Sequence, residues 1–320
     1  MFIIMIAFAI CPAWAQELTV LGGSMQDVKT HDHSYTWQLE YLEGLADHFA
    51  FSISYLNEGH VTDHHRDGYT VQAWTRTNVL DRRLSLSAGL GPYFYLDTKA
   101  ATAGADYTND HGWGGILSLA ATWYHGDRWL FQLRANWVET GRNIDTLSTL
   151  LGIGYRLDSP PSPGQHQNTP HHEETARRNE ITVFLGRTIV NSFGSEPSVA
   201  ASIEYRRGLL PYMDWTVSWL HEGENSLIRR EGLITQLWAV NEFFNGRLNL
   251  GLGGGAYLAV DRYRDPEKYG ASDDLVAGIV TLTAGYRFDP QWGIRVSWQR
   301  IVTDYSRDTD VILAGIGYMF

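Results

Sequence analysis

Residues 84–96 read LSLSAGLGPYFYL, a stretch in which apolar residues alternate with polar or small ones. One face carries Leu84, Leu86, Ala88, Leu90, Phe94 and Leu96, and the other carries Ser85, Ser87, Gly89, Gly91, Tyr93 and Tyr95. Because successive side chains of a β-strand point to opposite faces of its sheet, this period of two predicts a strand with one apolar face. Residues 129–137, WLFQLRANW, alternate in the same way.

About eight such strands precede residue 158, and each is long enough for a tilted strand to cross a bilayer. Short turns alternate with longer polar loops, and aromatic residues gather near the strand ends, as in outer-membrane barrels. The sequence therefore predicts an all-β fold, a transmembrane antiparallel up-and-down β-barrel. The alternative is a secreted soluble barrel or sandwich, in which outward apolar faces have no purpose. The expected strands are 18–28, 33–44, 49–60, 67–77, 84–96, 112–126, 129–139 and 144–157.

The composition argues against several other classes of protein. The 320 residues carry a formal net charge of −11. The body has no apolar run of about 18 residues, which argues against a bundle of membrane helices. An acidic chain without a basic block is not expected to bind nucleic acid. Aromatic residues make up 13 % of the chain, which argues against disorder.

The first segment, residues 1–15, resembles a signal peptide, although no Lys or Arg precedes its apolar region. Ala13-Trp14-Ala15 has the small-x-small pattern of a cleavage site, so we expect the mature chain to begin at about Gln16. The single cysteine, Cys11, lies in this segment. The mature chain is therefore expected to contain no disulfide and no thiolate metal site.

Residues 16–157 and 180–320 are interpreted as two copies of one eight-stranded unit, an internal duplication. YLNEG at 55–59 matches WLHEG at 219–223, and GYTVQAW at 68–74 matches GLITQLW at 232–238. Between the copies, residues 158–179 are rich in proline and histidine and show no period. This composition is typical of a linker, and its position after an eighth strand predicts that it is periplasmic.

Two tandem eight-stranded barrels fit this repeat, and so does a single barrel of sixteen strands. An eight-stranded barrel is just wide enough for side chains to fill it, and charges buried there need opposite partners. By strand parity, both repeats point glutamates, arginines and aromatic residues inward, which favours two filled barrels over one wide pore. The expected core charges are Glu40, Glu58, Arg76, Arg134 and Arg156 in the first repeat, and Glu204, Arg206, Glu222, Arg287 and Arg295 in the second.

The chain ends in DVILAGIGYMF, residues 310–320, an alternating strand with a terminal aromatic residue. This end resembles the C-terminal signal of Gram-negative outer-membrane β-barrels, and the resemblance extends over both repeats. It implies an outer-membrane location, contact with outer-membrane lipid and lipopolysaccharide, and recognition of Tyr318 and Phe320 by the barrel-assembly machinery. The spacing and alternation of residues in the last strands are also similar to those of lipid A 3-O-deacylases, but the His-x-Ser motif of those enzymes does not occur in this chain.

The first repeat also carries histidines in its expected outer loops, close to aspartates. His60, His64, His65 and Asp67 are the candidate ligands of a divalent metal such as zinc, and the alternative is an ordinary solvated loop. No cofactor is expected. A Ser nucleophile needs an adjacent base, so the sequence favours a non-enzymatic structural, binding or envelope-assembly role. A lipid A- or phospholipid-directed hydrolase remains an alternative, as does a diffusion pore if the sixteen strands form one barrel.

Overall fold

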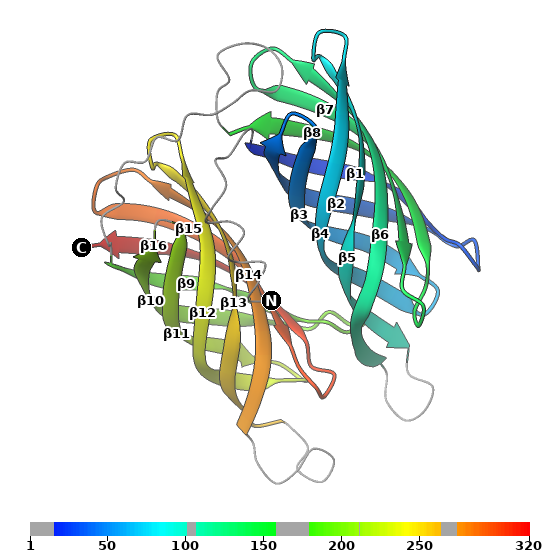
Figure 1. Cartoon of the computed structure of the whole chain (residues 1–320). Coiled ribbons are helices and arrows are strands. Elements are labelled where there is room, and N and C mark those ends of the chain that lie inside the picture. The colour runs from blue at the N-terminus through cyan, green and yellow to red at the C-terminus, as the bar shows by residue number, and fades with distance from the viewer. Residues whose placement is uncertain (1–15, 101–106, 158–178, 211, 264–273) are drawn as a thin grey trace. The chain divides into compact units, whose positions relative to one another are not determined.

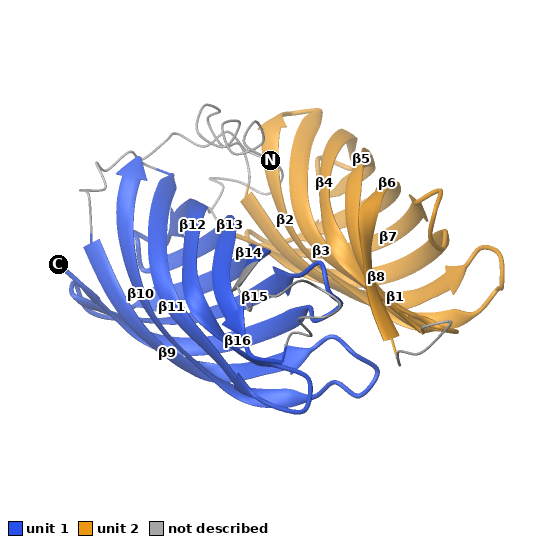
Figure 2. Ribbon diagram, turned by 90° about the horizontal axis from the view of Figure 1, so that it is seen from below, with its two compact units in different colours: residues 1–10, 172–320 blue, residues 11–171 orange. Residues whose placement is uncertain are grey.

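The computed structural model describes residues 16–100, 107–157, 179–210, 212–263 and 274–320. The expected signal peptide and all but the last residue of the expected linker lie outside these ranges. Among the described residues, no helix has the length and apolar character needed to cross a membrane. The chain divides into two compact units, which are coloured separately in Figure 2.

The N-terminal unit, drawn in orange in Figure 2, is a closed barrel of eight antiparallel strands, which we call the first barrel (Figure 1). Each strand pairs with the next along the chain, and β1 pairs with β8 from Glu17↔Arg156 to Asp27↔Thr146, which closes the sheet. The strands are β1 (Gln16–Asp27), β2 (His33–Ala46), β3 (Phe49–Val61), β4 (His64–Val79), β5 (Leu84–Ala100), β6 (Tyr107–His125), β7 (Trp129–Glu139) and β8 (Thr146–Arg156).

The C-terminal unit, drawn in blue in Figure 2, is a closed barrel of the same topology, which we call the second barrel. Its closing pair is β9 with β16, which runs from Glu180↔Met319 to Val190↔Thr309. The strands are β9 (Asn179–Val190), β10 (Pro197–Leu210), β11 (Met213–Glu224), β12 (Arg229–Phe243), β13 (Leu248–Asp261), β14 (Asp274–Arg287), β15 (Trp292–Val302) and β16 (Thr309–Met319).

The two closures decide between the architectures. A single sixteen-stranded barrel would need β8 to pair with β9, whereas β8 pairs with β1 and β9 pairs with β16. The prediction of two tandem eight-stranded barrels is therefore confirmed, and the sixteen-stranded alternative is wrong. A closed barrel has no edge strand, so every strand finds the partners for its backbone hydrogen bonds within the barrel itself.

Both barrels are apolar outside and polar inside. Large apolar side chains remain exposed on the outer wall of the strands, for example Leu90, Leu119 and Leu133, and Leu185 and Val199 in the second barrel. Glutamate, glutamine, serine, threonine and arginine side chains are buried in the interior. Because only a lipid environment makes such an outer wall favourable, this is the arrangement of a transmembrane β-barrel.

Aromatic pairs lie where strands meet the short turns. Trp129 and Tyr155 have ring centroids 5.2 Å apart, and the Arg128 guanidinium lies 5.5 Å from the Tyr155 ring. In the second barrel, Trp292 and Tyr318 have centroids 5.0 Å apart. Side chains of this amphipathic kind favour the boundary between lipid and water.

Candidate functional site

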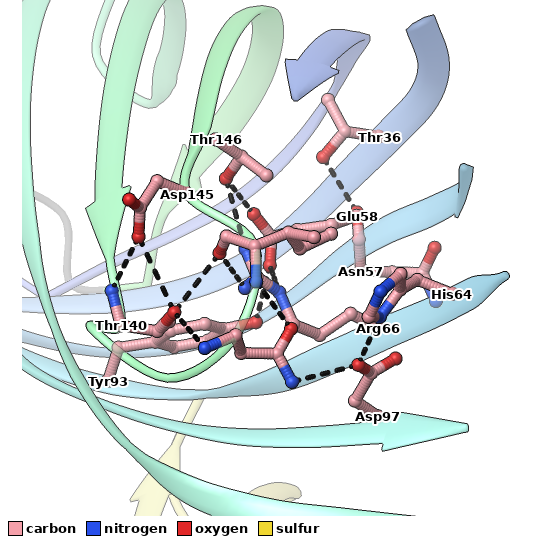
Figure 3. A network of polar contacts seen from close by, with 12 residues as sticks. Thr36, Asn57, Glu58, His64, Arg66, Tyr93, Asp97, Thr140, Asp145 and Thr146 are labelled. Carbon is pink, nitrogen blue, oxygen red and sulfur yellow. Dashed lines mark hydrogen bonds and ion pairs between the residues drawn. The ribbon is translucent and has the colours of Figure 1, made fainter. Parts of the chain in front are cut away.

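A network of buried polar side chains lies where odd-numbered strands end and even-numbered strands begin in the first barrel. We call this end of each barrel its mouth. Glu58 near the end of β3 and Arg66 near the start of β4 face each other, with Arg66 Nε 2.5 Å from Glu58 Oε2. The side chain of Glu58 is 1 % exposed and that of Arg66 is fully buried. Figure 3 shows both inside the barrel.

The carboxylate and the guanidinium each have further partners. Tyr93 OH on β5 donates to Glu58 Oε2 at 2.8 Å, and the Thr146 hydroxyl at the start of β8 donates to Glu58 Oε1. Arg66 also donates to Ile144 O, in the connection between β7 and β8, and to Thr146 Oγ1 at 3.2 Å. The network therefore ties four strands and one loop together across the mouth (Figure 3).

Further hydrogen bonds hold the same loop, the connection between β7 and β8, in place. Asn143 Nδ2, between β7 and β8, donates to Asp97 Oδ2 on β5 at 2.9 Å. His64 Nδ1 lies 2.6 Å from the same carboxylate oxygen. Thr140 and Asp145 close the loop on itself, because Thr140 N donates to Asp145 Oδ1 at 3.0 Å. The loop is held over the mouth by these contacts.

The second barrel repeats this arrangement with a different loop residue. Arg230 forms a two-contact pair with Glu222, and its Nη2 is 2.7 Å from Glu222 Oε2. Thr309 Oγ1 donates to Glu222 Oε2 at 2.7 Å. Tyr305, in the connection between β15 and β16, is 4 % exposed, donates to Asp261 and accepts from Arg230 Nη1. Its burial raises the pKa of the Tyr305 hydroxyl, so it stays a donor.

Ion pairs and aromatic rings fill the middle of each barrel. Arg134 forms a two-contact pair with Glu40, and its guanidinium lies 4.8 Å from the Trp74 ring. In the second barrel, Arg295 Nη2 donates to Glu204 Oε1 at 2.7 Å. Planar guanidinium–carboxylate pairs with extra hydrogen bonds are the geometry in which buried charges are tolerated.

Most of the remaining expected core charges are also buried. Arg156 lies over the Tyr124 ring at 4.3 Å, and Arg206 lies over the Trp238 ring at the same distance. Arg76 is 6 % exposed and donates to Ala46 O at 3.3 Å. Arg287 differs, because it is only half-buried and donates to Glu242 Oε1 at 3.2 Å.

Among the described residues of the first barrel, a small cavity of about 10 Å³ lies between Glu17, Trp74, Arg76, Tyr124 and Arg134. That volume has room for about one water molecule.

The expected metal ligands are not brought together as one set. Among the described residues, no three His, Cys, Asp or Glu side chains lie close enough to hold a metal ion. His64 faces Asp97, and Asp67 accepts a hydrogen bond of 2.7 Å from Tyr55 OH. His60 and His65 do lie together, with ring centroids 3.8 Å apart.

Sequence reasoning missed Arg66 and Arg230, which hold the two mouth networks. Residues 60–66 have the polar composition of a loop, which predicts a fourth strand that begins at 67, whereas β4 begins at His64. The available signal was spacing, because an arginine follows the matching glutamates Glu58 and Glu222 by eight residues in both repeats.

Comparisons with known proteins give similarity in fold alone. No family model and no curated protein match the sequence. Among solved structures, the N-terminal β-barrel domain of Pseudomonas aeruginosa OprF matches at 10 % identity and a TM-score of 0.35, covering 44 % of this chain and 98 % of that one. Neisserial surface protein A matches at 6 % identity and a TM-score of 0.36, covering 45 % and 96 %. The KdgM porin matches at 10 % identity and a TM-score of 0.20, covering 95 % and 99 %. At these scores, no family or function follows for this chain.

Proposed function

We propose that this chain is an integral outer-membrane protein whose two barrels are closed and non-conducting, with a non-enzymatic structural, binding or envelope-assembly role. The outer wall supports insertion into a bilayer, since exposed leucine and valine side chains such as Leu90 and Val199 are stable only against lipid. Helical spans are not needed, because strands of 11 residues or more cross the bilayer when tilted.

The observation that carries the proposal is the filled interior. In each barrel, paired charges occupy the middle, and a glutamate–arginine network with a pinned loop occupies the mouth. Eight strands enclose only enough space for such side chains. A continuous water path would require these buried charged pairs to separate, which is costly.

The proposed partners follow from this location. Outer-membrane lipid and lipopolysaccharide would surround the apolar walls of both barrels. The barrel-assembly machinery would recognise the last strand, where Tyr318 and Phe320 are 37 % and 58 % exposed and stack with centroids 6.2 Å apart. Phe320 N donates to Asn179 O at 2.9 Å, so this aromatic end also completes the closure of the second barrel.

We also propose that the two barrels arose by internal duplication. The recurrent contacts support this origin, because Glu58, Arg66, Tyr93 and Asp97 have counterparts 164 residues later at Glu222, Arg230, Tyr257 and Asp261. The tryptophan contacts recur too, since Trp74 Nε1 donates to Ser52 and Trp238 Nε1 donates to Thr216, both at 2.8 Å.

Planar-bilayer recordings with the purified full-length protein test the proposal. We expect no large, steady open channel at moderate voltage. Outer-membrane fractionation, together with faster gel migration of unboiled than of boiled protein, checks that the recorded material is folded. Steady large conductance from heat-modifiable protein would refute the closed-barrel proposal and favour a pore. Recovery from the soluble periplasm without detergent would refute the location.

A further inference from the structure

The two barrels differ at one matched residue pair in the hairpins around their mouths, which we call the rims. The β3–β4 hairpin of the first barrel pairs His60 with His65 in its ladder, and the β11–β12 hairpin of the second barrel pairs Glu224 with Arg229. These positions are 164 residues apart. The second barrel therefore has an ion pair there, with Arg229 Nε 3.4 Å from Glu224 Oε2, where the first has two imidazoles.

His60 and His65 stand directly opposite each other in the ladder, where the Cβ atoms of such a pair lie about 4.5–5.5 Å apart. Their ring centroids lie 3.8 Å apart, with an angle of 34° between the ring planes, so both rings are on the same face of the hairpin. Two nitrogens that bind one metal at about 2.0–2.1 Å each are at most about 4.2 Å apart, and rotation of the two side chains from this spacing brings one nitrogen of each ring to a shared ion. His60 is exposed and His65 is half-buried, so an ion can reach the pair from solvent.

The hairpin is held in place on both sides. His60 N donates to Ser34 Oγ at 2.8 Å, and the Tyr35 ring lies 6.2 Å from the His60 ring. On the other side, Ala100 N donates to Asp63 O at 3.1 Å. The hydroxyl of Thr62, in the turn of the hairpin, hydrogen-bonds the Asp32 carboxylate, which lowers the pKa of Asp32. A chelating pair on so restrained a hairpin loses little freedom on binding.

The chemistry of the side chains gives a second reason, because imidazole nitrogens are ligands of late first-row metals. The neighbouring carboxylates Asp97 and Asp67 are hydrogen-bonded to His64 and Tyr55, respectively.

We propose that His60 and His65 form a two-imidazole site for a divalent late first-row metal ion such as Cu²⁺, Ni²⁺ or Zn²⁺, with water completing the coordination. His64 and Asp67 are not ligands in this proposal. The site belongs to the first barrel only, and His65 lies on the face of β4 opposite to the buried Arg66. It does not depend on whether the barrels conduct ions.

Metal titration of the full-length, untagged protein in detergent tests the proposal, with Cu²⁺ as the probe. Calorimetry should give one bound ion per chain, and the electron paramagnetic resonance of bound Cu²⁺ should show coupling to nitrogen. His60→Gln and His65→Gln should each weaken binding by about tenfold or more, while the control His221→Gln, at an exposed histidine of the second barrel, should leave it unchanged. Heat-modifiable migration on gels shows that each variant is folded.

A gain-of-site variant tests the same geometry from the opposite direction. Glu224→His combined with Arg229→His places two imidazoles at the matched position of the second barrel, so the stoichiometry should rise from one ion to two. The proposal is overturned by any of three results. These are no saturable Cu²⁺ binding by the wild-type protein, binding that persists in His60→Gln/His65→Gln, or no second ion in the gain-of-site variant when that variant folds.

Discussion

Replacing Arg66 by Met tests whether the mouth network stabilises the first barrel. Arg66 is fully buried and contacts Glu58, Ile144 O and Thr146. The substitution leaves the Glu58 carboxylate buried without its cation. Breaking a buried pair in this way costs about 3–5 kcal/mol, so we expect a loss of that size in the free energy of unfolding.

The double variant Glu58→Met/Arg66→Met separates the ion pair from general damage. Removing both charges leaves only neutral groups without partners, chiefly the Tyr93 hydroxyl and Ile144 O, and such groups cost about 1–3 kcal/mol. The double variant should therefore be more stable than Arg66→Met alone, and the two substitutions should show strong favourable coupling in a double-mutant cycle.

Urea unfolding in lipid vesicles measures these differences in the free energy of unfolding, and hydrogen exchange shows which of the two barrels is destabilised. Arg230→Met should produce a matching loss confined to the second barrel. Lys99→Met is the control, because Lys99 and Asp110 are paired but partly exposed, and such a pair is worth about 0–1 kcal/mol. If Arg66→Met costs no more than Lys99→Met, or the double variant is less stable than either single one, the stabilising role of the pair is wrong.

Three further predictions concern assembly and permeability. Glu58→Ala/Arg66→Ala removes the first mouth network but leaves Arg134 paired with Glu40 against Trp74 in the middle of the barrel, so the folded variant should stay as non-conducting in planar bilayers as the wild type; steady conductance from this variant would show that the middle of the barrel does not block ions. Residues 179–320, expressed behind a signal peptide, should form a heat-modifiable barrel by themselves, because β9 closes on β16; persistent aggregation would count against independent closure. Deleting Phe320 should reduce the amount of folded protein in outer-membrane fractions, and substituting Phe320 with Tyr should preserve it if an aromatic end is what the assembly machinery reads.

The alternation of residues made the fold and the inward faces predictable. Successive side chains of a strand point to opposite faces of the sheet. Once the apolar residues are assigned to the outer wall, the alternate residues must therefore point into the barrel, whichever strands are paired. Glu40, Arg134, Glu204 and Arg295 were placed inward by parity alone, and all four are buried. The same rule placed Arg287 inward, but Arg287 lies at the short-turn end of β14, where solvent reaches it.

The partners of these charges could not be predicted, because they depend on the register of the closed sheet. Glu40 and Arg134 are 94 residues apart in sequence and meet across the barrel. The extension of strands beyond the bilayer was also missed, since polar residues outside lipid lose the apolar alternation. β6 begins at Tyr107 rather than at 112, and β4 begins at His64 rather than at 67.

The contrast between interior and rim indicates where the two barrels can differ in role. Closure of eight strands leaves a narrow interior that only paired, space-filling side chains satisfy, so the Glu58–Arg66 and Glu222–Arg230 networks have nearly the same form in both barrels. The rim faces water and carries no such packing requirement. There, His60 and His65 stand opposite each other in one barrel, and Glu224 and Arg229 do so in the other. Exchanging rim residues between the barrels should therefore transfer any binding property, whereas exchanging interior pairs should change stability alone.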